Sequence, residues 1–187
     1  MIRGTAVYGL EASVIRSGFP MVVKSGEAKS DFNRAIKLAG TPAGSGHDCF
    51  LKGIIVQADF VMPQYWWQQA KRYHWFDFIS SQSTMHRIGS MKLSEACNKH
   101  VDPRIIRIAQ GYIDDYNDGL CSIDVVLSNI PQGLLLCAGI TTNYLQLKTM
   151  YAQRKTHRLP EWSDEFTKWV ERLPYSELIT SGGNTNG

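Results

Sequence analysis

The sequence has few cysteines and no long apolar run, and each absence excludes a class of protein. Its four cysteines, at positions 49, 97, 121 and 137, are far apart and form no CxxC pair. This spacing argues against a structural zinc site or a disulfide scaffold and fits a reducing compartment. The longest apolar stretch, near residues 133–140, is too short to span a bilayer, and the N-terminus lacks the apolar run of a signal peptide. We therefore expect a cytoplasmic protein with no membrane partner.

The net charge is low, and the common catalytic motifs are absent from the sequence. The formal net charge of +3 is too small to predict binding of a nucleic-acid polymer, although it is compatible with a phosphate-bearing ligand. The chain has no HExxH motif, no Ser-His-Asp ordering and no carboxylate pair that stands out, so neither a hydrolase nor a metal site is supported. We find no internal repeat or linker, and we expect one domain over residues 1–180 with a flexible tail at 181–187.

The most informative stretch of the chain runs from His47 to Arg87. Residues 50–62 are rich in β-branched and aromatic side chains, which predicts a strand. Pro63 ends this strand and suits the first turn of a helix, which we expect over residues 64–79. The helical segment mixes aromatic rings with hydrogen-bond donors, and hydroxyls, an amide and basic groups follow it. A strand–helix junction with so many donors is typical of a site for an anionic ligand that carries a ring.

Most aromatic residues of this stretch are better explained as core or subunit interface than as a cofactor site. The polar Gln69, Arg72 and His74 still need partners, and Arg72, which is always charged, favours an anion or a carboxylate. Ser83 and Arg87 can hold a phosphate through a hydroxyl and a bidentate guanidinium. Alternatively, the serines simply cap the end of a helix.

The remaining elements are predicted from apolar periodicity and end signals. We expect strands over residues 2–10 and 134–142, and helices over 11–19, 31–40, 104–117, 143–157 and from 160 onward. The glycine loop at 41–46 can cradle a phosphate but lacks the P-loop spacing, so a plain connection is the better interpretation. In the predicted helix 143–157, basic residues near the C-terminal end complement the helix dipole, and Arg154 points inward more than Lys155.

These residues resemble the flavin-dependent thymidylate synthases. That family carries a His in a loop, then a strand, a proline and a helix with a Gln, followed by an Arg-His-Arg triplet and a Ser-x-Arg-Tyr ending. Here the same order occurs at His47, Pro63, Gln69, Arg72-Tyr73-His74 and the segment 83–87. A second block of the family, a Pro, an apolar strand, an Asn-x-Arg helix start and a later Arg, is similar to Pro131, the strand, Asn143-Tyr144-Leu145 and Arg154. The resemblance covers roughly residues 46–170.

The chain departs from the family pattern at several positions. Tyr73 and His74 replace a His and an Arg that help to hold FAD, and Leu145 replaces the Arg of the Asn-x-Arg start. The Ser-x-Arg-Tyr ending fits the segment 83–87 only with a small insertion. The resemblance therefore favours the nucleotide half of the site over the flavin half.

The resemblance implies an α/β (α+β) fold, with an antiparallel sheet flanked by helices, and active sites formed between the subunits of a homotetramer. It implies reductive methylation of dUMP to dTMP, with methylenetetrahydrofolate as the carbon donor and FAD, reduced by NADPH, as the hydride donor. The implied substrate-binding residues are Gln69, Ser83, Arg87 and Arg154, with Ser83 and Arg154 in the catalytic step. The implied flavin-binding residues are His47, Arg72, His74 and Asn143.

Two alternatives to this function stay open at the level of the sequence. The protein can be a nucleotide-binding or regulatory module that has kept the fold and lost the flavin chemistry. It can also be a related enzyme that hydroxymethylates a pyrimidine deoxynucleotide. Retention of a yellow flavin separates the enzyme from the binding module, and the substrate base separates methylation of dUMP from the hydroxymethylation.

Overall fold

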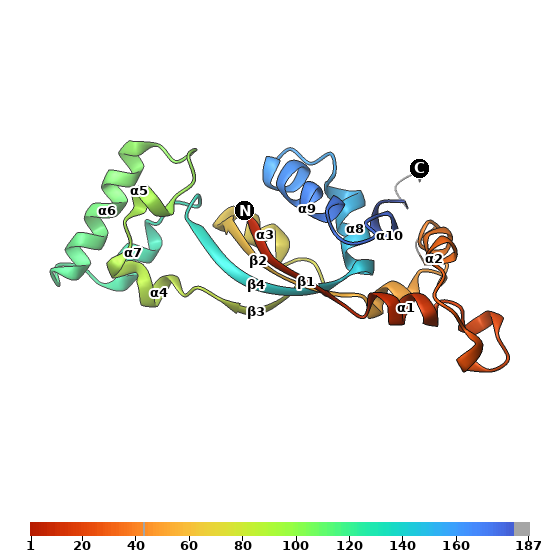
Figure 1. Cartoon of the computed structure of the whole chain (residues 1–187). Coiled ribbons are helices and arrows are strands. Elements are labelled where there is room, and N and C mark those ends of the chain that lie inside the picture. The colour runs from red at the N-terminus through yellow and green to blue at the C-terminus, as the bar shows by residue number, and fades with distance from the viewer. Residues whose placement is uncertain (43, 182–187) are drawn as a thin grey trace.

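The structure, a computed structural model, describes residues 1–42 and 44–181 (Figure 1). The predicted flexible tail, apart from its first residue, Ser181, lies outside the described residues. The expectation of a single domain over residues 1–180 stays a prediction.

One long, curved antiparallel sheet organises the described chain (Figure 1). Its strands are β1 (Ile2–Tyr8), β2 (Ile55–Pro63), β3 (Asp77–Ser81) and β4 (Leu135–Asn143), in the order β1-β2-β4-β3. The central pair is β2 with β4, which are in register from Ile55 opposite Asn143 to Pro63 opposite Leu135. Alternate residues of β2 are buried, as expected for a strand with one face on the core. The predicted antiparallel sheet flanked by helices is confirmed.

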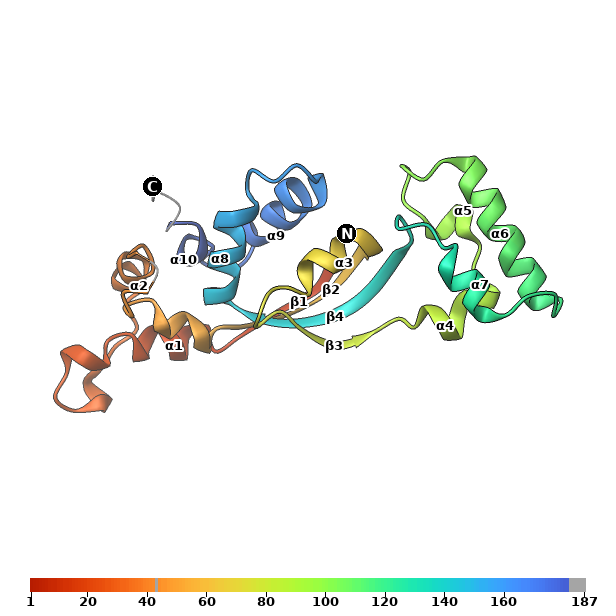
Figure 2. The same ribbon diagram turned by 180° about the vertical axis from the view of Figure 1, so that it is seen from behind.

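The helices form two groups, one over the sheet and one at its far end (Figures 1 and 2). The first group comprises α2 (Phe32–Ala39), α3 (Gln64–Ala70), α8 (Tyr144–Arg154), a π-helix at Glu161–Phe166, α9 (Thr167–Glu171) and α10 (Glu177–Thr180), with α1 (Leu10–Arg16) at the edge. The second group comprises α4 (Thr84–Arg87), α5 (Leu93–Ala96), α6 (Pro103–Asn117) and α7 (Ile123–Ser128). Short 3₁₀ helices occur at Phe19–Met21, Ser25–Glu27, Cys49–Gly53 and Ile88–Ser90. No helix in the described residues is long and apolar enough to cross a membrane.

Each group of helices has its own buried cluster. Under the first group, aromatic rings stack on the sheet, with the Trp66 and Trp162 centroids 4.3 Å apart. The second cluster is aliphatic and is centred on Ile113 of α6 and Leu134. Leu136 of β4 packs against both clusters and links them. The far group is therefore a distinct unit that β3 and β4 join to the rest.

The helix predicted over residues 64–79 is wrong beyond Ala70. α3 ends there, Trp75 has a left-handed backbone with φ 40°, and Asp77–Ser81 form the edge strand β3. The residues of β3 pair with the edge of β4, which offers backbone hydrogen-bond partners. Local propensity does not include this long-range pairing, so it could not predict the strand. Consequently His74 lies in a connecting turn between α3 and β3 and not on a helix.

Local signals in the sequence fix where several elements begin. The Asp31 side chain accepts a hydrogen bond from the Arg34 backbone N–H at 2.9 Å and caps α2. Asp102 caps α6 in the same manner, with Pro103 in the first turn. The turn from β1 into α1 requires Gly9, since its φ is +72° and a Cβ there would lie 2.5 Å from the Gly53 carbonyl oxygen.

Candidate functional site

The helix α8 and its capping residue form the base of the candidate site. Asn143, the last residue of β4, accepts a hydrogen bond from the Gln146 backbone N–H at 2.9 Å and is buried. This cap fixes where α8 leaves the sheet. Leu147 and Met150 bury one side of the helix in the core, so its other side is left to face a surface depression.

Three adjoining pockets, with volumes of about 440, 600 and 490 Å³, run along this side of the helix. They share Thr149, and we call them together the α8 groove. Its walls include Lys52, Trp75 and Asn143 in the first pocket, Gly44, Gly46 and Asp48 in the second, and Arg72, His74 and Arg154 in the third.

Arg154 is held in place at one end of the groove. Its Nε donates to the Tyr73 hydroxyl at 2.6 Å, and its Nη1 donates to Gln69 Oε1 at 3.2 Å. The guanidinium carbon lies 4.5 Å from the centroid of the Trp162 ring and 5.2 Å from that of Tyr73. Gln69 Oε1 also accepts from Trp162 Nε1 at 3.0 Å. Arg154 makes no ion pair with any carboxylate in the described part of the chain, so its charge is left for an anion.

The structure brings several of the predicted flavin-binding residues to the α8 groove. Arg72 and His74 are exposed and line the same pocket as Arg154. Asn143 lines the pocket at the other end, although its side-chain oxygen already caps α8. His47 is exposed and does not line the groove, but its neighbours Gly46 and Asp48 do.

Ser83, which caps α4, and Arg87, the last residue of α4, lie away from the α8 groove at the far end of the sheet (Figure 1). The Ser83 hydroxyl accepts a hydrogen bond from the His86 backbone N–H at 3.3 Å, so the helix-cap interpretation describes its contact in the free chain. Arg87 is exposed and makes no ion pair among the described residues. One chain by itself therefore does not unite these two residues with Arg154.

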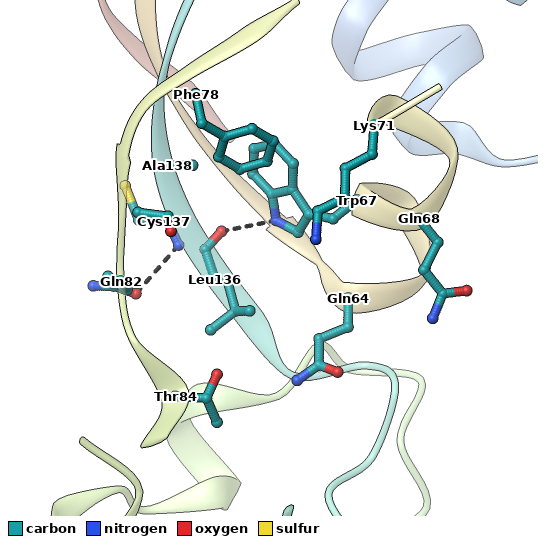
Figure 3. A pocket seen from close by; sticks show the side chains of 11 residues that line it. Gln64, Trp67, Gln68, Lys71, Phe78, Gln82, Thr84, Leu136, Cys137 and Ala138 are labelled. Carbon is teal, nitrogen blue, oxygen red and sulfur yellow. Dashed lines mark hydrogen bonds between the residues drawn. The ribbon is translucent and has the colours of Figure 1, made fainter. Parts of the chain in front are cut away.

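A second pocket, of about 290 Å³, lies next to α4, between α3 and the strands β3 and β4 (Figure 3). We call it the α3–β3 pocket. Trp67 and Phe78 supply aromatic surface, and Lys71 lies over the Phe78 ring at 5.9 Å from its centroid. The Gln82 side-chain oxygen accepts from the Cys137 backbone N–H at 3.2 Å, which fixes its amide beside Thr84, the first residue of α4. Rings, amides and a cation make the pocket suited to an anionic ring-bearing ligand.

Sequence reasoning did not single out Lys71 or Gln82 as site residues. Both lie beside segments that it did identify, but the pocket is closed by β4, which is more than fifty residues away in the sequence. No local signal in the sequence points to this meeting of α3, β3 and β4.

His157, three residues after Arg154, reports on the charge at this end of the groove. Burial lowers the pKa of His157 below its usual value, and the positive charges of Arg154 and Arg158 lower it further. An anion bound to Arg154 opposes that positive field, so saturation with an anion is expected to raise the His157 pKa. By linkage, an anion whose own charge is constant should bind more tightly as the pH falls through the titration of this imidazole.

This effect can be followed by NMR titration of the His157 ring protons with and without sulfate. His100, which is exposed and remote in sequence, is the internal control. An unchanged pKa of His157 at saturating sulfate would show that the anion does not bind at Arg154.

No family model and no curated protein matches the sequence, whereas solved structures match the fold. Two structures of the flavin-dependent thymidylate synthase ThyX from Helicobacter pylori, both with FAD and dUMP, align with TM-scores of 0.77 and 0.74. Their sequence identities are 10% and 11%, and the alignments cover 96% and 99% of this chain and 97% and 98% of theirs. The UMP/dUMP methylase PolB from Streptomyces cacaoi, bound with 5-Br dUMP, aligns with a TM-score of 0.66 at 14% identity, over 100% of this chain and 96% of that one. The chain thus has the fold of the flavin-dependent thymidylate synthases.

Proposed function

We propose that this chain is an enzyme that methylates the uracil ring of dUMP, with FAD as its redox cofactor. The observation that carries the proposal is the Arg154 guanidinium, which is held by Tyr73 and Gln69 over the Trp162 ring with no carboxylate partner in the described chain. A preorganised, unpaired guanidinium in a groove is suited to a phosphate or a ring carbonyl. The solved structures with this fold carry dUMP or a dUMP analogue, which supports the choice of ligand.

The substrate site would be completed between subunits of a homotetramer. Gln69 and Arg154 would come from one protomer, and Ser83 and Arg87 from another, next to the α3–β3 pocket. Two observations support this arrangement. Gln69 and Arg154 belong to helices over the sheet, α3 and α8, whereas Ser83 and Arg87 begin and end α4 at the far end of the sheet (Figure 1). All five residues of β3 are exposed in the single chain. Within residues 1–42 and 44–181, the side of the sheet opposite α3, α8, α9 and α10 also carries no helices (Figures 1 and 2), which leaves room for a partner.

The residues along the α8 groove fit a flavin. The Trp75 side chain is 58% exposed, so its indole can stack on a planar ring. Its left-handed backbone costs energy, as is common for residues at functional sites. Arg72, His74 and Asn143 would hold the cofactor, with His47 in the adjacent loop. When bound, FAD supplies the hydride for the reduction, after its own reduction by NADPH, and methylenetetrahydrofolate supplies the carbon.

The contribution of the chain itself would be positioning and charge stabilisation. Arg154 would bind the anionic group of dUMP and polarise the pyrimidine, because its guanidinium is already oriented by two hydrogen bonds. Gln69 would orient the nucleotide through its amide nitrogen, since its oxygen is occupied by Arg154 and Trp162. Ser83 would orient the same nucleotide from the partner.

The test is an absorption spectrum from 300 to 550 nm before and after addition of FAD and removal of the excess. We expect a retained flavin spectrum, followed by formation of dTMP from dUMP when methylenetetrahydrofolate and NADPH are supplied. The same assay with dCMP separates methylation of dUMP from hydroxymethylation of a cytosine nucleotide. A protein that retains no FAD and forms no dTMP would overturn the proposal.

A nucleotide-binding module without flavin chemistry is the second candidate. Leu145 favours it, because this residue lines the α8 groove at the position where the resemblance places an Arg. For this candidate we expect a colourless protein whose calorimetric titration still shows dUMP or dCMP binding.

A further inference from the structure

Lys52 is a cation of the α8 groove that the motifs do not explain. It lies in the 3₁₀ helix Cys49–Gly53, directly before β2, and its side chain lines both the Trp75 pocket and the pocket of the glycine loop. It is exposed and makes no ion pair with any carboxylate of residues 1–42 and 44–181. Lys52 therefore stands where two pockets meet, with its charge unpaired.

The charges around Lys52 leave the groove strongly positive. Among the described residues that line the three pockets, Asp48 is the sole acidic side chain. Its carboxylate is already neutralised by Lys148, whose Nζ lies 2.7 Å away, and both side chains are buried. The charges of Lys52, Arg72 and Arg154 are consequently uncompensated, and a groove lined by one sign of charge concentrates anions.

The glycine loop adds backbone donors next to Lys52. Gly44 and Gly46 have left-handed φ values of +86° and +81°, and a Cβ at either position would touch nothing within 4 Å. Packing within the described chain therefore does not require glycine at these positions. Their backbone N–H groups donate to no acceptor in the described residues. Free amides in a left-handed glycine turn are a recurrent binding surface for phosphate oxygens.

The length of the groove indicates more than one anionic group. Lys52 shares a pocket with Asn143, which caps the start of α8, whereas Arg72 shares a pocket with Arg154 at the end of the helix. The helix has 11 residues, which at 1.5 Å per residue corresponds to about 16 Å. One phosphate cannot contact both ends, so the Lys52 end is available to a second anionic group. Trp75 in the same pocket adds a stacking surface for a ring attached to that anion.

We infer that Lys52 and the amides of Gly44 and Gly46 form a diphosphate-binding site for the dinucleotide cofactor, separate from the nucleotide site at Arg154. The inference rests on the proposed function, since it identifies which part of FAD this end of the groove binds. It also explains how the groove retains positive charge beside Leu145, because Lys52 lines the same two pockets as that residue.

The test compares Lys52→Gln with the unchanged protein, using FAD, riboflavin and inorganic diphosphate as ligands in calorimetric titrations. Losing one charged hydrogen-bond donor should weaken FAD and diphosphate binding about tenfold or more. Riboflavin, which has no phosphate, should bind both proteins equally, and so should dUMP. Lys52→Arg should bind FAD like the unchanged protein, and Lys29→Gln, an exposed lysine outside the groove, is the matched control.

The outcomes separate the two proposals. If the unchanged protein binds FAD and Lys52→Gln binds FAD and diphosphate equally well, the diphosphate site is wrong and the proposed function stands. If no variant binds FAD but diphosphate binding is lost in Lys52→Gln, the anion site stands and the flavin mechanism fails. Equal loss of riboflavin and FAD binding in Lys52→Gln would also overturn the diphosphate assignment.

Discussion

Replacing Arg154 with alanine is expected to weaken dUMP binding by between about tenfold and a hundredfold. Among the described residues at this end of the groove, the guanidinium is the one group that is both charged and oriented by two hydrogen bonds, to Tyr73 and Gln69. The effect on folding should be smaller, on the order of 1 kcal/mol, because the side chain is half-exposed and its loss leaves two polar partners that water can reach. Calorimetric titration with dUMP measures the first effect, and urea unfolding measures the second.

Two further variants identify the cause of the loss. Arg154→Lys keeps the positive charge but cannot maintain the planar contacts with Tyr73 and Trp162, so we expect an affinity between those of the unchanged protein and Arg154→Ala. Arg16→Ala removes an exposed arginine of α1, outside the α8 groove, and should leave dUMP affinity unchanged. Unaltered dUMP binding by Arg154→Ala would remove Arg154 from the substrate site.

Replacing Asp48 with alanine is expected to destabilise the fold by about 3–5 kcal/mol. The Lys148 ammonium is buried and donates to Asp48 at 2.7 Å, to the Ala39 carbonyl at 2.6 Å and to the Thr41 carbonyl at 3.3 Å. Without the carboxylate a buried ammonium keeps only neutral partners, and the loss is a large share of the 5–15 kcal/mol that is usual for a domain. The midpoint of urea unfolding measures the change.

The matched controls use one apolar pair and one exposed pair. The double variant Asp48→Leu with Lys148→Met removes both charges and should recover much of the lost stability. Glu95→Ala breaks the exposed pair with Lys92, whose charged atoms are 3.9 Å apart, and should change stability by less than about 1 kcal/mol. A similar small change for Asp48→Ala would mean that Lys148 finds water or another acceptor.

Part of the fold could be predicted from the sequence because its signals are local. The β2 strand, the stop at Pro63, the cap at Asp31 and the strand before Asn143 all follow from neighbouring residues. The edge strand β3 could not be predicted in this manner, because its segment has no propensity strong enough to exclude a helix. Pairing with β4, about sixty residues away, decides its structure.

The candidate site was predictable to a similar degree. Gln69, Arg72 and His74 stood out as polar residues in a mostly apolar segment, and the second block of the resemblance added Arg154. Lys52 could not be predicted from the sequence, because it is a single lysine in a short 3₁₀ helix. Only the packing of that helix against α8 makes it part of the groove. The separation of Ser83 from Arg154 likewise depends on the curvature and length of the sheet, which no residue pattern encodes (Figure 1).

The two buried clusters have a consequence for motion. A unit with its own core, connected through Leu136 and the ends of two strands, can open while the larger core stays closed, at a free-energy cost below that of global unfolding. Amide exchange in α6 would then be faster than in β2. Ser83 and Arg87 belong to this more labile unit, so a nucleotide shared between protomers would slow its opening. Binding of the nucleotide and the ordering of the unit that contains α4, α5, α6 and α7 would therefore be thermodynamically coupled.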